Sequence, residues 1–253
     1  MATNPKGRFS NRVEDYVKYR PGYPKEILSY LQDEFGLNNT QMVVDIGAGT
    51  GISTALFLEA GYHVIAVEPN REMREKSVEL LSHFTKLITI DGNAEHTTLA
   101  NEAADLIVAG QAFHWFDPEE SKKEFSRILK PGGRLAIIWN ERKVRSPFEM
   151  EYEKLIIKHG TDYEKIDHRN INDRDIESFF SPRSCLLKIF DNFQLFDFEG
   201  LRGRLLSSSY MPALDAPGYQ EMVVDLASLF QEFNRENQVR IGYDTKLYAG
   251  FFK

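Results

Sequence analysis

Gly47, Gly49 and Gly51 alternate with small residues in a short stretch of the chain. The apolar run before them predicts the end of a buried strand, and the residues after them predict a helix at 51–59. Such a turn brings backbone N–H groups close to a ligand, because glycine has no Cβ to block the approach. Glu68 ends the next predicted strand, about 20 residues beyond the glycines, where a carboxylate accepts hydrogen bonds from the ribose of a nucleoside cofactor. The stretch therefore predicts a nucleoside-binding site.

His114 is the residue best suited to acid–base chemistry. It stands between Phe113 and Trp115, just after a strand predicted at 104–109. Ligands of α/β proteins bind at the carboxyl ends of the strands, and histidine, which titrates near neutral pH, can orient or deprotonate an acceptor there. Packing or substrate orientation is the alternative role, and the sequence favours it. The sequence contains no serine-hydrolase elbow, zinc-protease motif or P-loop, and its single cysteine, Cys185, excludes a multi-cysteine metal site.

Alternating strand and helix patterns must position these residues. Strands are predicted at 42–46, 62–67, 87–91, 104–109 and 134–139, after a tight turn at 130–133, and helices at 51–59, 70–81 and 118–129. Short connections between alternating elements predict a mainly parallel sheet covered on both faces. Outside this core, helices are predicted at 8–19, 27–35, 149–159, 199–208 and 219–234, and strands at 184–198 and 238–252.

Length and composition limit the class of protein. A chain of 253 residues suffices for one α/β domain with additions and a sizeable core. A net charge of −7 argues against a general nucleic-acid-binding surface. The sequence contains neither an apolar stretch of the ~18 residues that a membrane span needs nor the apolar segment of a signal peptide. We therefore expect a cytoplasmic protein, monomeric or homodimeric, with a small-molecule partner and neither nucleic acid nor a membrane.

The spacing of the motif distinguishes between nucleoside cofactors. A dinucleotide fingerprint places its third glycine at position 52, which is Ile52 here, so a nicotinamide oxidoreductase is disfavoured. The pattern Asp45-x-Gly-x-Gly-x-Gly, followed by a strand that ends in Glu68, resembles motif I of the class I S-adenosylmethionine-dependent methyltransferases. Three further motifs resemble the small-molecule, type 11 branch, which includes trans-aconitate-methyltransferase-like proteins. They are Phe9-x6-Tyr16-x2-Tyr19-Arg20-Pro21-x-Tyr23-Pro24, Ala112-Phe113-His114-Trp115-Phe116, and Leu205-Leu206-Ser207-Ser208-Ser209-Tyr210-Met211-Pro212.

The resemblance implies a fold and a cofactor. The fold is Rossmann-like, with seven strands in the order 3-2-1-4-5-7-6, strand seven antiparallel, a helical N-terminal cap and an insertion after strand five. Asn93 stands where many family members carry an Asp that meets the adenine amino group, and its amide carbonyl can still accept that hydrogen bond. Asp45 is expected to order the glycine turn and to lie toward the methionine amino group. The residues expected to bind S-adenosylmethionine are Asp45, Gly47, Ala48, Gly49, Thr50, Gly51, Glu68, Pro69, Met73, Asn93, Ala94, Glu95, Gln111 and Ala112.

The same resemblance implies an acceptor pocket. Aromatic faces there would stabilise a sulfonium by cation–π attraction. Arg20 would suit a carboxylic acid through a bidentate contact, although it could instead only brace the N-terminal cap helices. The expected substrate-binding residues are Tyr16, Tyr19, Arg20, His114, Trp115, Trp139 and Tyr210.

These observations predict one methyltransferase domain over residues 1–253. Cap helices are expected at 8–36, the cofactor-binding core at 37–140, a helical insertion at 141–183, and the last strands and helices at 184–253. The reaction expected is methyl transfer to an oxygen, nitrogen or carbon of a metabolite-sized acceptor, with His114 as the base if one acts. A non-catalytic nucleoside-binding module of the same fold is the alternative.

Overall fold

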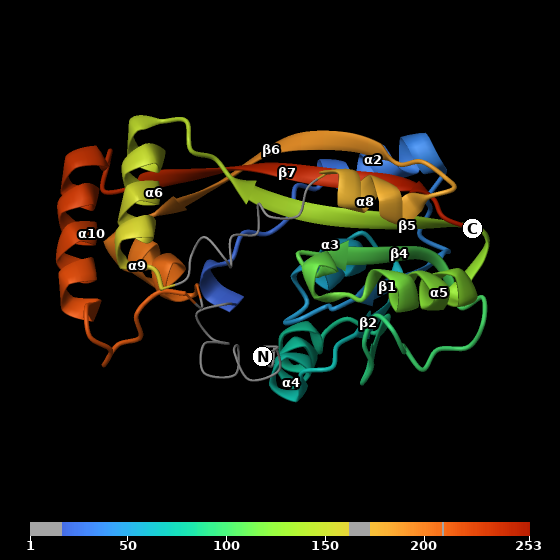
Figure 1. Ribbon diagram of the computed structural model, residues 1–253. Helices are drawn as coiled ribbons and strands as arrows, with labels where there is room; N and C mark the ends of the chain where they lie inside the picture. Colours follow the sequence, from blue (N-terminus) through green and yellow to red (C-terminus); the bar gives the residue numbers. More distant parts are fainter. Residues whose placement is uncertain (1–16, 162–172, 209) are drawn as a thin grey trace.

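The computed structural model describes residues 17–161, 173–208 and 210–253, and a seven-stranded sheet forms its centre (Figure 1). The strand order is β3-β2-β1-β4-β5-β7-β6. The pairs among β1 to β5 are parallel, whereas β7 pairs antiparallel with both β5 and β6. This confirms the predicted fold class. The strands are β1 (Met42–Ile46), β2 (His63–Val67), β3 (Leu87–Ile90), β4 (Ala104–Gly110), β5 (Leu129–Arg142), β6 (Leu186–Phe196) and β7 (Val239–Phe251).

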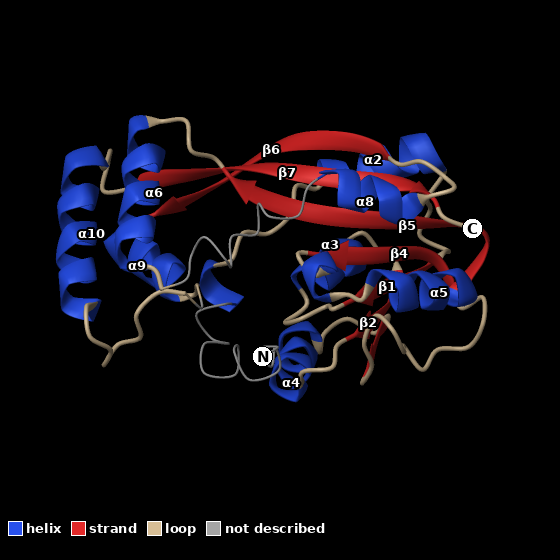
Figure 2. Ribbon diagram, viewed as in Figure 1, coloured by secondary structure: helices blue, strands red, loops and turns tan. Residues whose placement is uncertain are grey.

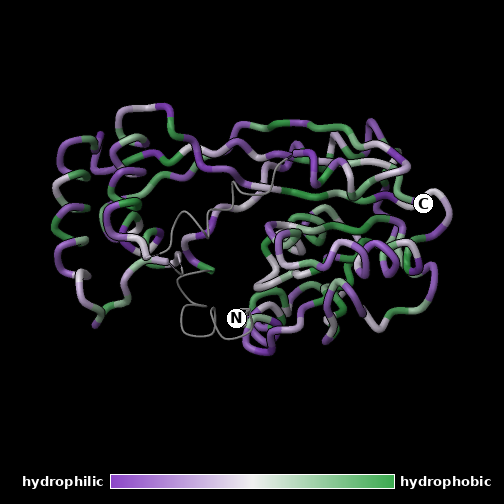
Figure 3. The backbone as a smooth tube through the Cα atoms, viewed as in Figure 1, coloured by the Kyte–Doolittle hydropathy of each residue, from purple (hydrophilic) through white to green (hydrophobic). Residues whose placement is uncertain are grey.

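Helices cover both faces of the sheet (Figure 2). The covering helices are α2 (Glu26–Phe35), α3 (Ile52–Glu59), α4 (Arg71–Leu81), α5 (Pro118–Ile128) and α8 (Asp173–Phe180). Side-chain caps fix where two of them begin, because the Asn70 side chain accepts the Met73 N–H and the Asp117 side chain accepts the N–H groups of Glu119 and Glu120. The central strands are apolar along most of their length (Figure 3), as expected for parallel strands buried on both faces.

A second group of helices lies beyond the edge of the parallel sheet, where β5, β6 and β7 extend past the other strands (Figure 1). We call α6 (Pro147–His159), α9 (Phe198–Leu206) and α10 (Tyr219–Phe233) the helical cap. They enclose a hydrophobic core of their own, which includes Tyr152, Leu205, Met222, Leu226 and Tyr243. The ends of β6 and β7 form part of this core, so the cap is held to the sheet by packing as well as by the chain.

The stretch 141–183 contributes to two different places. Its first helix, α6, joins the helical cap, and Ser146 caps it one residue before its first. Its second helix, α8, packs on the sheet through Ile176, Phe179 and Phe180. The polar composition of 160–178 gave no prediction of α8.

Two other details differ from the sequence prediction. The turn expected at 130–133 lies inside β5, because Leu129 already pairs with Ala104 and the register shifts before Arg134 pairs with Leu106. The strand also continues to Arg142 instead of ending at 139, since β7 pairs with it along this length. The helix expected at 8–19 is described only from residue 17. Within the described residues, none of the helices combines the length and apolar character needed to span a bilayer.

Candidate functional site

The glycine turn connects β1 to α3 and leans on the end of β2. The N–H groups of Gly47 and Ala48 both donate to the Val67 carbonyl, at 2.9 and 3.2 Å. Gly47 has a φ of +68°, and a Cβ there would lie 2.7 Å from the Cβ of Ala112. Both observations require glycine at this position. The turn therefore lies directly against the loop that follows β4.

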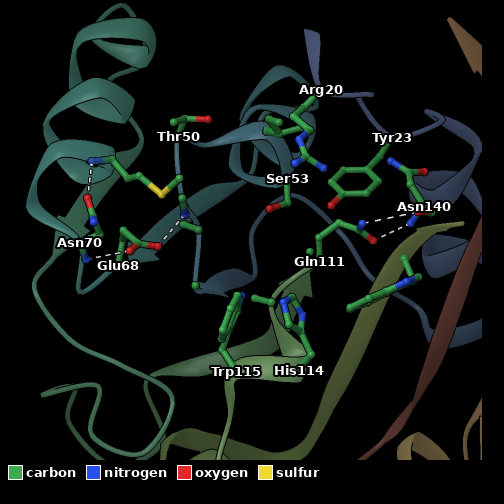
Figure 4. Close-up of a pocket in the computed structure, with 18 of the residues that line it drawn as sticks. Arg20, Tyr23, Thr50, Ser53, Glu68, Asn70, Gln111, His114, Trp115 and Asn140 are labelled. Carbon is green, nitrogen blue, oxygen red and sulfur yellow. Dashed lines mark hydrogen bonds between the residues drawn. The ribbon is translucent and has the colours of Figure 1, made fainter. Parts of the chain in front are cut away.

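Glu68 is buried beside this turn, and two backbone N–H groups hold its carboxylate (Figure 4). Oε2 accepts from the Gly49 N–H and Oε1 from the Asn70 N–H, each at 2.8 Å. Burial raises the pKa of Glu68, against the lowering effect of these two bonds. A carboxylate has about four acceptor positions, so each oxygen keeps capacity for a ligand hydroxyl.

Asp45 lies behind the turn and does not line the cavity. It is fully buried, and its Oδ2 accepts from Ser53 Oγ at 2.7 Å and Thr54 Oγ1 at 2.6 Å. Oδ1 has no hydrogen-bond partner among the described residues. Burial raises the pKa of Asp45 to about 6, although the two hydroxyls lower it. Asp45 thus fixes the first turn of α3 against β1.

The loop after β3 contributes polar groups that are already bonded to the protein. Asn93 Oδ1 accepts the His96 N–H at 2.8 Å, which leaves its second lone pair for a ligand. Glu95 Oε1 accepts the Asp117 N–H at 2.8 Å. Glu95 therefore also supports the start of α5.

Gln111 and Asn140 tie the end of β4 to β5. The Asn140 N–H donates to Gln111 Oε1 at 2.7 Å, and Gln111 has a φ of +56°, which is strained for a residue with a Cβ. Asn140 Nδ2 donates to the Gly22 carbonyl at 3.2 Å, and its Oδ1 accepts from Thr245 Oγ1. One amide side chain thus joins the N-terminal segment, β5 and β7.

His114 lies in the short helix η3 (Phe113–Trp115). Its ring centroid is 4.4 Å from that of Trp115 and 5.4 Å from that of Trp139. Trp115 is exposed and Trp139 is buried, with 41% and 4% of each residue exposed. Figure 4 shows His114 and Trp115 along one side of the cavity, with Glu68 at one end and Arg20 and Asn140 at the other.

One cavity of about 360 Å³ brings these groups together. Most of the residues predicted from the sequence line it, namely Arg20, Gly47, Ala48, Gly49, Thr50, Glu68, Pro69, Met73, Asn93, Ala94, Glu95, Gln111, Ala112, His114, Trp115, Trp139 and Tyr210.

Three predicted residues that the structure describes do not line the cavity: Asp45, Gly51 and Tyr19. Gly51 has a φ of +92°, and a Cβ there would lie 2.6 Å from Leu81 Cδ1, so it serves packing behind the turn. The Tyr19 ring lies over Gly203 of α9, where a Cβ would approach it to 2.0 Å. Tyr16 lies outside the described residues.

The sequence prediction missed several lining residues. Tyr23 and Ser53 meet above Gly110, where a Cβ would lie 2.8 Å from the Tyr23 hydroxyl and 2.9 Å from Ser53 Oγ. Tyr23 belongs to a motif already singled out, so that signal was present. Pro21 and Phe116 also line the cavity and belong to quoted motifs, and Ile52, Asn70 and Gly110 lie beside predicted strand ends or the glycine turn. The remaining missed residues depend on tertiary contacts and had no local signal: Asn140, Glu141, Arg142, Arg204 and Tyr243.

Comparison with known proteins gives the relatives of this chain. A family model described as a methyltransferase domain, of type 11, matches residues 44–137. An uncharacterised methyltransferase of Schizosaccharomyces pombe is 36% identical over 151 residues, which cover 59% of each chain. An uncharacterised methyltransferase of Mycobacterium tuberculosis is 34% identical over 152 residues, or 60% of each chain. The chain thus spans about three fifths of the length of these curated relatives.

Solved structures share the whole fold. A structure assigned as a type II methyltransferase of Anaeromyxobacter dehalogenans superposes with a TM-score of 0.71 at 18% identity, over 92% of this chain and 98% of that one. Phosphoethanolamine N-methyltransferase 2 of Haemonchus contortus superposes with a TM-score of 0.55 at 18% identity, over 96% of this chain and 57% of that one. At these identities the match is one of fold.

Proposed function

We propose that this chain transfers a methyl group from S-adenosylmethionine to a small-molecule acceptor. The premise is that the chain belongs to the class I S-adenosylmethionine-dependent methyltransferases. The observation that carries the proposal is the Glu68 carboxylate. It is fixed between the N–H groups of Gly49 and Asn70 at the edge of the glycine turn. A buried carboxylate held in this way is suited to accept the two hydroxyls of a ribose.

The residues along the cavity fit the rest of the cofactor. Met73 and Asn93 line the same cavity as Glu68 and would contact the adenine, and Gly47 and Gly49 of the glycine turn line it as well. Gln111 and Ala112 would offer backbone carbonyls to the ammonium group of the methionine portion. The bound cofactor supplies a methyl group on a sulfonium, which is already a good electrophile.

The protein's part in this reaction is to position the acceptor and to exclude water. Trp115, Trp139 and Tyr210 line the cavity and offer aromatic faces that would stabilise a sulfonium. An acceptor carboxylate needs no general base, whereas a hydroxyl or carbon acid does, and His114 is placed to act in that case. The Haemonchus contortus protein was solved with S-adenosylhomocysteine and phosphomonomethylethanolamine together. That protein thus holds a nucleoside and a small acceptor together in a similar fold, which supports a small acceptor here. A carboxylic acid is the acceptor that Arg20 would suit.

Calorimetric titration with S-adenosylmethionine and S-adenosylhomocysteine tests the proposal, with NAD(H) as the control ligand. We expect both methionine nucleosides to bind the wild type, NAD(H) not to bind, and Glu68→Ala to weaken binding. No binding by a folded sample freed of carried-over ligand would refute the proposal. Release of S-adenosylhomocysteine in an acceptor screen then separates an enzyme from a binding module without turnover.

A further inference from the structure

Arg204 is a buried cation without an acidic partner among the described residues. It lies on α9, is 8% exposed and lines the cavity. Its Nε donates to the Tyr243 hydroxyl at 3.2 Å, and its Nη1 lies 3.4 Å from the hydroxyls of Ser207 and Ser208. Among the described residues, Nη2 has no hydrogen-bond acceptor. Every partner of this guanidinium is therefore a neutral hydroxyl.

The surrounding phenols do not neutralise it. The tyrosines that interact with Arg204 electrostatically are Tyr243, Tyr152 and Tyr210. A phenol ordinarily ionises near pH 10, so it carries no charge at neutral pH. Burial raises the pKa of Tyr152 further. Burying a charge costs free energy unless a counter-charge accompanies it, and this chain does not supply one in its described residues.

A second arginine in the same cavity shows the contrast. Arg142 pairs with the carboxylate of Glu153, and its guanidinium lies 5.2 Å from the ring centre of Tyr152. The charge of Arg142 is thus matched within the helical cap. The charge of Arg204 is not.

Acidic side chains lie toward one end of the cavity and guanidinium groups toward the other. Glu68 and Glu95 lie toward the loops after β2 and β3, at the end proposed for the nucleoside. Near Arg204, the Arg20 Nη2 donates to the Ser207 carbonyl at 3.1 Å, so two guanidinium groups approach Ser207 from different elements. The acid on β5, Glu141, lies 2.8 Å from Lys246. The end of the cavity beside the helical cap is therefore cationic.

We propose that Arg204 recognises the methyl acceptor by binding an anionic oxygen group on it, a carboxylate or a phosphate. The inference rests on the proposed function, because it assigns this end of the cavity to the acceptor. A guanidinium presents N–H groups in a fixed fork that matches either anion in two parallel hydrogen bonds. Arg204 is then a specificity-determining residue of the acceptor site.

The test uses the full chain saturated with S-adenosylhomocysteine, so that the nucleoside end is filled. Succinate, inorganic phosphate and neutral succinamide are titrated calorimetrically at low salt. Arg204→Gln removes the charge, and Arg204→Lys keeps it without the fork. Arg202→Gln is the matched control, since Arg202 lies on the same helix, is only partly buried, does not line the cavity and pairs with Glu199. We expect succinate or phosphate to bind the wild type and the control, and to bind Arg204→Gln about tenfold or more weakly.

Each outcome decides one point. Preference for succinate over phosphate identifies a carboxylate as the anion, and the reverse preference identifies a phosphate. Equal binding of succinate and succinamide, no anion binding, or an unchanged affinity in Arg204→Gln overturns the inference while leaving the proposed function standing. If Arg204→Gln does not fold, the wild-type comparison of succinate with succinamide and the Arg204→Lys variant decide.

Two controls separate this inference from the proposal on which it rests. Failure of the wild type to bind S-adenosylhomocysteine refutes the proposed function itself. A loss of S-adenosylhomocysteine affinity in Arg204→Gln, with 5′-methylthioadenosine bound as in the wild type, would place Arg204 at the methionine carboxylate. That result would overturn the assignment to the acceptor.

Discussion

Replacing Glu68 by Gln tests the centre of the proposed nucleoside site. The carboxylate accepts two backbone N–H groups at 2.8 Å and, in the proposed complex, two ribose hydroxyls. An amide of the same shape has one oxygen and one NH₂ group, and the NH₂ group can only donate hydrogen bonds. On its side the amide would therefore face a backbone N–H donor and could not accept a hydrogen bond from a ribose hydroxyl. Hydrogen bonds to a charged group contribute about 1.5–3 kcal/mol each. We therefore expect a loss of about 2–4 kcal/mol in binding, or about 30- to 700-fold in the dissociation constant of S-adenosylhomocysteine.

The assay compares S-adenosylhomocysteine with an analogue that lacks both ribose hydroxyls. Glu72→Gln is the matched control, because Glu72 is an exposed acid in the first turn of α4 and makes the same change in net charge. We expect Glu68→Gln to weaken the natural ligand far more than the deoxygenated analogue, and Glu72→Gln to change neither. An equal loss for both ligands would refute the ribose assignment, since the effect would then come from a disturbed turn.

Three further predictions concern stability. Burial raises the pKa of Asp45 from 3.8 to about 6 in the folded protein, so the contribution of this group to wild-type stability should fall by about 3 kcal/mol as the pH rises from about 3 to about 7. Urea unfolding of Asp45→Asn should lack this fall, and a retained fall would contradict the assignment. Gly47→Ala should lower the free energy of unfolding by more than the ~1–2 kcal/mol that a left-handed backbone costs, because its Cβ would also clash with Ala112. Gly132→Ala, at a φ of +73° with open space around it, should lose only the conformational part, and equal losses of the two variants in urea unfolding would rule out the clash. Burial would raise the pKa of Glu124, but its ion pair with Arg127 and its hydrogen bonds lower the pKa to about 2. Glu124→Gln should therefore destabilise the protein at neutral pH, and the stability difference from the wild type should shrink below pH 4.5; a difference in thermal unfolding that did not change with pH would contradict this role of Glu124.

The fold was predictable because its signals are local. The strand around Val44, the turn at Gly47 and the cap at Asn70 each follow from residues within one element. The start and end of β5 were not predictable in the same way. Leu129 enters the sheet by pairing with Ala104, and Asn140 remains in it because β7 runs alongside. Both depend on a partner strand far away in the sequence.

The candidate site likewise has one part that local sequence signals predict and another that depends on tertiary contacts. The nucleoside end uses backbone groups and side chains that lie close to the glycine turn in sequence or at the tips of adjacent strands, so its spacing is visible in the chain. Tyr19 shows the limit of a motif, because the sequence places it in the right segment but its ring packs on Gly203. Arg204 had no signal at all. A charged residue in a predicted helix ordinarily indicates a solvated face, and only the packing of α9 against α10 and β6, with Tyr243 of β7 beside it, buries Arg204.

The two ends of the cavity are therefore formed by different parts of the structure. The end proposed for the nucleoside is formed at the tips of β1, β2, β3 and β4, whereas the opposite end depends on contacts between the N-terminal segment, β5, β7 and the helical cap. Asn140 joins three of these through Gly22 and Thr245, and Arg20 joins the fourth through Ser207. We therefore expect substitutions in the helical cap to change the shape and charge of the proposed acceptor end without moving Glu68 or the glycine turn. The methyltransferase-domain match covers residues 44–137 and the helical cap lies outside it, so we expect the proposed choice of acceptor to depend on residues such as Arg204 and not on the glycine-turn motif.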